Sequence, residues 1–205
     1  RRIHGVVQAH GGITLIDEIY LGLSYEEQFG HTALAIADDI ISINSFSKYF
    51  NMTGWRLGWM VVPEQLVPVI ERLAQNLFIC ASTIAQHAAL ACFEPDSIAE
   101  YERRRAAFKA RRDYFIPELQ QLGLNVPVMP DGAFYAWADG TQAATRLGVQ
   151  GSWDLAYALM DRAHLAVTPG RDFGMHEPER FLRFSTASSM DHLQEAVRRL
   201  RALLG

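Results

Sequence analysis

Short apolar runs that end in polar residues mark the first part of the chain. Residues 13–17 read Ile-Thr-Leu-Ile-Asp, and residues 39–43 contain three isoleucines. Such runs are typical of buried strands whose carboxyl ends open into a site. Residues 57–62 predict a third strand, and residues 1–10 predict the end of a helix. The pattern therefore predicts strands combined with helices.

Helical spacing of the apolar positions begins after Pro63. These positions are Leu66, Val69, Ile70, Leu73 and Leu77. Two capping boxes, Thr83–Gln86 and Ser97–Glu100, predict a helix that begins at Thr83 and a long helix that begins at Ser97. Pro117 lies inside the long helix and should kink it.

A smaller α+β unit is predicted after the long helix. Its expected strands cover residues 133–138, 166–168 and 181–185, and its expected helices cover residues 152–164 and 193–204. We therefore expect two domains, formed by residues 1–95 and 96–205.

Composition excludes several classes of function. The chain has 205 residues, of which 49% are hydrophobic and 20% charged, and its net charge of −4 provides no general attraction to nucleic acid or anionic membrane. No apolar run is long enough to span a bilayer. The basic run Arg103-Arg104-Arg105 is expected to be a solvated helix face. Cys80 and Cys92 lack a CxxC pairing, so we expect buried free thiols and a reducing, cytoplasmic compartment.

The candidate chemistry centres on the polar loop between the strands predicted at 39–43 and 57–62. Lys48 in this loop offers an amine nucleophile. Ser45 and Arg56, a hydroxyl and a guanidinium, suit a phosphate dianion. Asp17 ends another apolar run, and in a parallel sheet both carboxyl ends would lie on one edge.

Plainer interpretations of the same residues stay open. Asp17 could cap a turn, Tyr20 could be a packing residue, and Arg56 could form a surface ion pair. Arg183 could be a strand arginine that lies over an aromatic ring. Among the aromatic residues, Trp55 is expected in the core rather than against a ligand. The histidines show no metal-ligand spacing, so no metal site is expected.

A family resemblance joins these residues. The segment Ser-Phe-Ser-Lys-Tyr-Phe-Asn-Met-Thr-Gly-Trp-Arg-Leu-Gly-Trp, residues 45–59, resembles the pyridoxal-phosphate attachment segment of class I/II aminotransferases, the aspartate-aminotransferase-like enzymes of fold type I. Residues 17–20, 130–135, 167–174 and 181–185 resemble further motifs of this family, in the family's order. The resemblance covers about the second half of the family's length.

The resemblance implies an α/β fold. Residues 1–95 would be the C-terminal part of the large cofactor-binding domain, a mostly parallel sheet with helices. Residues 96–205 would be the long linking helix and a small α+β C-terminal domain.

The resemblance also implies the cofactor, pyridoxal 5'-phosphate, and a role for each matching residue. Lys48 would form a Schiff base with the cofactor aldehyde and then act as the base that moves a proton. Asp17 would pair with the pyridine nitrogen, and Tyr20 would bond the ring's phenolic oxygen. Ser45 and Arg56 would hold the phosphate.

The implied reaction moves an amino group from an α-amino acid to a 2-oxo acid, with Arg183 binding the substrate α-carboxylate. A homodimer is implied, and neither nucleic acid nor membrane is an expected partner. We expect residues 1–205 alone to be nearly inactive and to leave an apolar sheet face exposed, because part of the site would lie upstream.

Three alternatives stay open for the function. The same fold could carry a lyase or racemase reaction on the same cofactor. The chain could also be an aminotransferase-like effector domain of a transcription regulator, without catalysis. The third alternative is a helical nucleic-acid or scaffold module based on the arginine-bearing helix. The acidic net charge argues against it.

Overall fold

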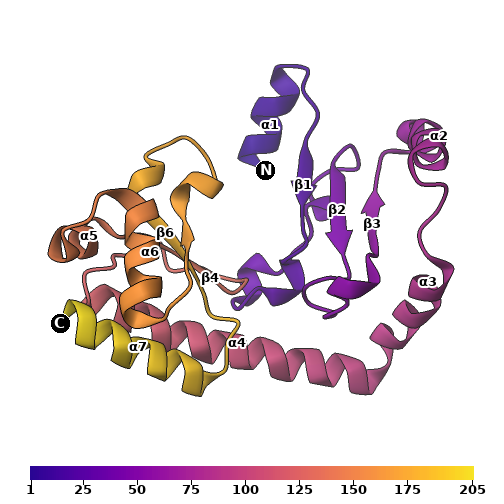
Figure 1. Cartoon of the computed structure of the whole chain (residues 1–205). Helices are drawn as coiled ribbons and strands as arrows, with labels where there is room; N and C mark the ends of the chain where they lie inside the picture. Colours follow the sequence, from indigo (N-terminus) through magenta and orange to yellow (C-terminus); the bar gives the residue numbers. More distant parts are fainter. The chain divides into compact units, whose positions relative to one another are not determined.

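The computed structural model describes residues 1–205, which form two compact units, Arg1–Arg105 and Ala106–Gly205 (Figure 1). The long helix α4 (Pro95–Gln121) contributes to both units. It begins two residues before the predicted start at Ser97, and Pro117 lies inside it. The domain boundary predicted after residue 95 stays a prediction, because the division of the chain into compact units falls between Arg105 and Ala106, inside α4.

The sheet of the first unit has the strand order β1-β2-β3, and its strands are β1 (Leu15–Asp17), β2 (Ile41–Ser45) and β3 (Gly58–Val61). β1 pairs in parallel with β2, with Asp17 opposite Ile43. β2 pairs antiparallel with β3, with Ser45 opposite Gly58. The three predicted strands are confirmed, although β2 begins and ends two residues later than predicted.

Three shorter helices belong to the same unit: α1 (Arg2–Ala9), α2 (Val67–Leu77) and α3 (Thr83–Leu90). The capping box predicted at Thr83 is displaced by one residue, because the hydroxyl of Ser82 accepts the hydrogen bond from the Ala85 amide. Single 3-10 turns cover Leu21–Leu23, Glu27–Phe29, Ala33–Ala35, Thr53–Trp55, Glu64–Leu66 and Ala91–Phe93.

The lysine loop, defined here as residues 46–57, forms much of the unit's hydrophobic core. Its side chains Phe46, Met52 and Leu57 are buried and pack with Ala85, Ala89, Cys92 and Tyr101 of the helical segments. The Phe46 and Phe50 ring centroids lie 4.9 Å apart. Trp55 is 46% exposed, so the expectation that it belongs to the core is wrong. Cys92 is buried as expected, whereas Cys80 is exposed.

Glu18 is a buried carboxylate that holds the two parallel strands together. It accepts hydrogen bonds from the Ser42 hydroxyl at 2.6 Å, the Ala33 amide at 2.5 Å and the Thr32 hydroxyl at 2.9 Å. Burial would raise the pKa of Glu18, but these hydrogen bonds and one from Asn44 outweigh it, so the pKa lies below 4.5. Glu18 is therefore a structural anion, fixed in its charged form.

The second unit has an antiparallel sheet of order β4-β6-β5, formed by β4 (Tyr135–Asp139), β6 (Phe181–Ser185) and β5 (Thr168–Pro169). Its helices are α5 (Thr141–Leu147), α6 (Gly151–Ala163) and α7 (Met190–Leu204), and 3-10 turns cover Gly170–Asp172 and Pro178–Arg180. The helix predicted at residues 193–204 is confirmed as α7, whose buried face includes Leu193, Val197 and Leu200. Sequence reasoning did not predict α5.

Several apolar side chains of the first unit's sheet are exposed. Leu15 is 54% exposed, Met60 48% and Val61 41%. Met60 and Val61 are consecutive residues of β3 and point to opposite faces of the sheet, and β2 lies between β3 and Leu15 of β1. The expected apolar sheet face therefore stays a prediction. None of the helices is both long and apolar enough to cross a lipid bilayer.

Replacing Gly58 with alanine should destabilise the protein by about 1–3 kcal/mol, because overpacking costs are of this size. A Cβ atom at Gly58 would lie 2.7 Å from the Asn44 carbonyl oxygen of the paired strand. Gly54 is the matched control, since its Cβ would have no neighbour within 4 Å. Urea unfolding of both variants measures the difference, and equal losses would contradict the packing explanation.

Glu18→Gln should lower the free energy of unfolding by about 1–3 kcal/mol at neutral pH, because the amide NH₂ would face hydrogen-bond donors. The wild-type pKa is lowered, so its stabilising contribution is present above 4.5 and is lost as the pH falls through the folded-state value. The variant should lack this part of the acid destabilisation.

The adjacent exposed residue Asp17 provides the control for this measurement. Asp17→Asn should change the free energy of unfolding by less than about 0.5 kcal/mol, as is usual for surface substitutions. Chemical unfolding of the three proteins between neutral pH and pH 4 measures both effects. A Glu18→Gln variant with wild-type stability and acid slope would refute the anchoring role.

Candidate functional site

The carboxyl ends of β1 and β2 place the acidic residue and the lysine loop on one edge of the sheet. Asp17 is the last residue of β1, and Ser45 is the last residue of the parallel strand β2. The predicted common edge is therefore confirmed. Asp17 is exposed, and its Oδ1 accepts a hydrogen bond from the Ile19 amide at 3.1 Å. The turn-capping interpretation of Asp17 is thus also correct, and one carboxylate can serve both purposes.

The side chains of Tyr20 and Lys48 are in contact at this edge of the sheet. The Lys48 ammonium nitrogen lies 5.8 Å from the centroid of the Tyr20 ring, within the range of a cation–π contact. Both side chains are partly buried. The segment that follows β1 is therefore in contact with the segment that follows β2, and Asp17, Tyr20 and Lys48 belong to one local surface.

Backbone and side-chain hydrogen bonds fix the path of the lysine loop. The Phe46 amide donates to the Leu57 carbonyl, and the Met52 amide donates to the Phe46 carbonyl at 2.9 Å. The Ser45 hydroxyl accepts from the Ser47 amide at 3.0 Å and donates to the Leu57 carbonyl at 3.4 Å. Ser45 thus braces the loop, and its predicted contact with a phosphate stays a prediction.

Arg56 is presented from a strained backbone position. Its φ angle is 54°, in the left-handed region, and Asn51 in the same loop has a φ angle of 56°. Such conformations cost about 1–3 kcal/mol each and gather at functional sites. The Arg56 side chain is exposed, donates to the Thr53 carbonyl at 2.8 Å and has no carboxylate partner. The alternative of a surface ion pair is therefore wrong.

Tyr49 anchors the lysine loop to α4, a contact that sequence reasoning missed. Its hydroxyl donates to the Glu102 carboxylate at 2.6 Å, and its ring lies 5.3 Å from the Tyr101 ring. Burial, together with the hydrogen bond and negative charge of Glu102, raises the pKa of Tyr49 to about 12. The residue next to Lys48 is therefore a protonated hydrogen-bond donor at any physiological pH.

Arg183 lies in the second unit, on β6 opposite Trp137 of β4. Its guanidinium carbon lies 4.3 Å from the Tyr135 ring centroid and 4.4 Å from the Phe173 ring centroid. The interpretation of Arg183 as a strand arginine over an aromatic ring is therefore correct. Its predicted function at the same site as Lys48 stays a prediction.

The basic run on α4 forms a solvated, ion-paired face, as expected. Arg103 and Arg104 both bond Glu100, and this lowers the pKa of Glu100 to about 2. Lys109 pairs with Asp113 at 2.9 Å. Charges that are neutralised within one helix give no positive surface for nucleic acid.

Known proteins resemble the chain over most of its length. A family described as aminotransferase class I and II matches residues 1–200. Valine–pyruvate aminotransferase of Mycobacterium tuberculosis is 34% identical over 191 residues, which cover 92% of this chain and 47% of that protein. Aspartate aminotransferase of Geobacillus stearothermophilus is 32% identical over 206 residues, which cover 97% of this chain and 51% of that protein.

Solved structures resemble this one with the same coverage. A crystal structure from Silicibacter pomeroyi superposes with a TM-score of 0.89 at 42% identity, over 98% of this chain and 52% of that one. A Thermus thermophilus aspartate aminotransferase mutant gives 0.85 at 31% identity, over 97% of this chain and 53% of that one. The expected fold, part of the fold-type I architecture, is therefore confirmed.

The chain spans about half the length of the curated relatives that it matches. Within that span, the family match, the relatives and the solved structures agree, and the lysine loop lies inside all of these matches. The chain belongs to the class I and II aminotransferase family, whose members depend on pyridoxal phosphate.

Proposed function

We propose that the protein containing this chain is a pyridoxal-phosphate-dependent aminotransferase, which moves an amino group from an α-amino acid to a 2-oxo acid. The observation that carries the proposal is the shared edge of β1 and β2, where the Asp17 carboxylate and the lysine loop lie together. Because the chain spans half of its relatives, the activity is proposed for the longer polypeptide.

The residues at this edge fit the chemical groups of pyridoxal phosphate. The cofactor has a basic ring nitrogen, an aldehyde and a phosphate, which call for an acid, an amine and a cation. Asp17, Lys48 and Arg56 are these three groups, and neither Asp17 nor Arg56 has an opposite charge as a partner. Backbone hydrogen bonds fix the loop that carries Lys48 and Arg56 before any ligand arrives.

Each side chain then has a defined task. When bound, pyridoxal phosphate supplies the carbonyl that takes the amino group and a ring that accepts electrons. The Asp17 carboxylate keeps the ring nitrogen protonated, which strengthens that electron demand. The Lys48 amine would hold the cofactor and, once the substrate amine displaces it, would take the proton from the substrate α-carbon and deliver it to the cofactor carbon that receives the amino group.

The remaining side chains bind and orient. The Tyr20 hydroxyl donates to the ring oxygen, and its ring already contacts Lys48. The Arg56 guanidinium, with the Ser45 hydroxyl, binds the phosphate. The Arg183 guanidinium binds the substrate α-carboxylate through two parallel N–H donors, which lysine could not imitate.

The substrate class, assembly and location are proposed only in general terms. The relatives' names point to different substrates, such as valine with pyruvate or aspartate, so we propose only α-amino acids and 2-oxo acids. The exposed apolar residues of β1 and β3 support association with further chain and are compatible with a homodimer. The unpaired cysteines support a reducing, cytoplasmic compartment.

Borohydride reduction of the natural polypeptide with pyridoxal phosphate should attach the cofactor to Lys48, as mapped by mass spectrometry. Lys109, the only other lysine of the chain, is an internal control, because it pairs with Asp113 on α4. Exclusive labelling at Lys48 would support the proposal. Labelling of Lys109 alone, or none, would refute it.

The same protein should convert its cofactor to the amine form when it is mixed with suitable α-amino acids, and absorbance spectra would follow this. Release of ammonia would instead indicate a lyase, and loss of substrate chirality a racemase. Cofactor attachment without turnover of any amino acid would favour the effector-domain alternative.

Arg56→Gln should raise the dissociation constant of pyridoxal phosphate by about 10- to 100-fold, because a charge-assisted contact contributes about 1.5–3 kcal/mol. Arg72→Gln is the control, since Arg72 is exposed on α2 outside the lysine loop. Fluorescence titration of both variants gives the constants. Equal affinities for the two variants would exclude Arg56 from the phosphate site.

A further inference from the structure

The guanidinium of Arg183 lies over the faces of two aromatic rings, those of Tyr135 and Phe173. Tyr135 lies on β4, two residues before Trp137, the cross-strand partner of Arg183. Phe173 follows the 3-10 turn Gly170–Asp172, and its ring centroid lies 4.4 Å from the guanidinium carbon, as close as that of Tyr135 at 4.3 Å. The two rings thus offer their faces to one cation.

Contacts with ring faces do not use the N–H groups of the guanidinium as hydrogen-bond donors. Its N–H groups lie in the plane of the group and point outward along that edge, where a carboxylate binds with two parallel hydrogen bonds. None of the ion pairs in this unit includes Arg183, whose guanidinium contacts the two rings instead. The rings therefore fix the plane of the donor without competing for its N–H groups.

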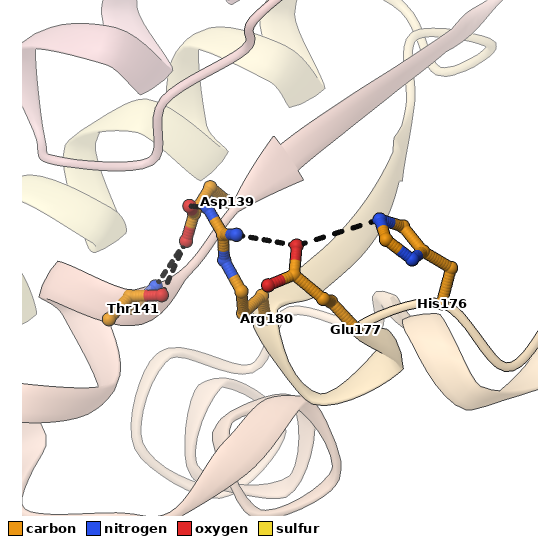
Figure 2. Close-up of polar contacts among 5 residues, drawn as sticks. All are labelled: Asp139, Thr141, His176, Glu177 and Arg180. Carbon is orange, nitrogen blue, oxygen red and sulfur yellow. Dashed lines mark hydrogen bonds and ion pairs between the residues drawn. The ribbon is translucent and has the colours of Figure 1, made fainter.

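Phe173 is held in place by a braced loop. The base of this loop is closed by an Arg171–Glu179 ion pair at 2.9 Å and by the Arg180–Asp139 pair at 2.7 Å. Figure 2 shows Arg180 lying between Asp139 and Glu177, with His176 beyond Glu177.

Gly170 allows the close approach within this loop, since a Cβ atom there would lie 2.3 Å from the Pro178 carbonyl oxygen. The Phe173 and Trp137 rings are also in T-shaped contact, at a centroid distance of 5.4 Å. The exposed loop tip at Met175 contrasts with this fixed aromatic position, because Met175 is 93% exposed and Phe173 only 45%.

We propose that Phe173 is a positioning residue: together with Tyr135 it holds the Arg183 guanidinium so that its N–H edge is directed at the α-carboxylate of the substrate. The inference rests on the proposed carboxylate-binding role of Arg183. It also gives a function to the loop of residues 170–180, which has no other part in the proposed reaction.

The test uses the natural polypeptide loaded with pyridoxal phosphate. Phe173→Leu should raise the KM for α-amino acids by about 5- to 30-fold, the range expected from a partly desolvated cation–π contact. The kcat should change much less, because the ring contacts Arg183 and not the reacting atoms. Phe173→Tyr keeps the ring and should restore a KM within about twofold of the wild type.

Two controls separate positioning from general damage. The amine that corresponds to the substrate without its carboxylate should react at the same rate with the wild type and with Phe173→Leu. Tyr157→Leu removes a ring of similar exposure, 46%, from α6 and should leave the KM unchanged. An equal effect of Phe173→Leu on the amine, or an equal effect of Tyr157→Leu, would overturn the proposal.

A double-mutant cycle distinguishes this inference from the proposed function itself. Arg183→Lys should raise the KM strongly, and Phe173→Leu should add nothing in that background, since lysine has no plane to align. If Arg183→Lys weakens binding but Phe173→Leu does not, only the positioning role is overturned. If Arg183→Lys leaves the KM unchanged, the carboxylate role of Arg183 fails and the positioning role fails with it.

Discussion

The burial of the lysine loop is the constraint on which the first unit depends. Phe46, Met52 and Leu57 come from the segment that carries Lys48, and they form a core with α3 and the start of α4. Each buried side chain of this kind contributes about 1.5–3 kcal/mol. A loop with this role cannot be mobile while the unit is folded, so the position of Lys48 is set when the core forms. The hydrogen bond from Tyr49 to Glu102 extends the same constraint to α4.

In both units, neighbouring residues hold the polar side chains of the candidate site in place, but the kinds of interaction differ. In the first, a buried carboxylate and an aromatic core hold polar side chains at the carboxyl ends of parallel strands. In the second, two rings and a pair of ion pairs hold one guanidinium on an antiparallel sheet. Asp17 and Arg56 in the first unit and Arg183 in the second form no ion pair within their own unit. The supporting residues carry the structural interactions instead.

Much of the secondary structure and most of the candidate residues follow from the sequence. The strands β1 and β6 are visible as apolar runs, and the Lys48 segment is specific enough to identify a family. The prediction fails where contacts between distant residues determine the local structure or the burial of a side chain. The helix α5 is short and lacks a long periodic stripe, and Trp55 looks like a core residue although its loop turns it outward.

The roles of Glu18 and Tyr49 also could not be predicted. The structural role of Glu18 depends on its hydrogen bond with Ser42, which lies 24 residues away in the sequence. The role of Tyr49 depends on its hydrogen bond with Glu102, which lies 53 residues away. A single sequence does not show which distant residues form hydrogen bonds with each other in the folded protein.

The adjacency of Asp17 and Glu18 limits how this segment can change in evolution. Successive side chains along an extended backbone point to opposite sides, so one carboxylate is exposed and its neighbour is buried. Inserting or deleting one residue between Leu15 and Tyr20 would exchange the two sides. The structural anion would then face outward, and the exposed one would lie among donors that it does not fit. The number of residues in this short segment is therefore constrained as strictly as the identities of Asp17 and Glu18.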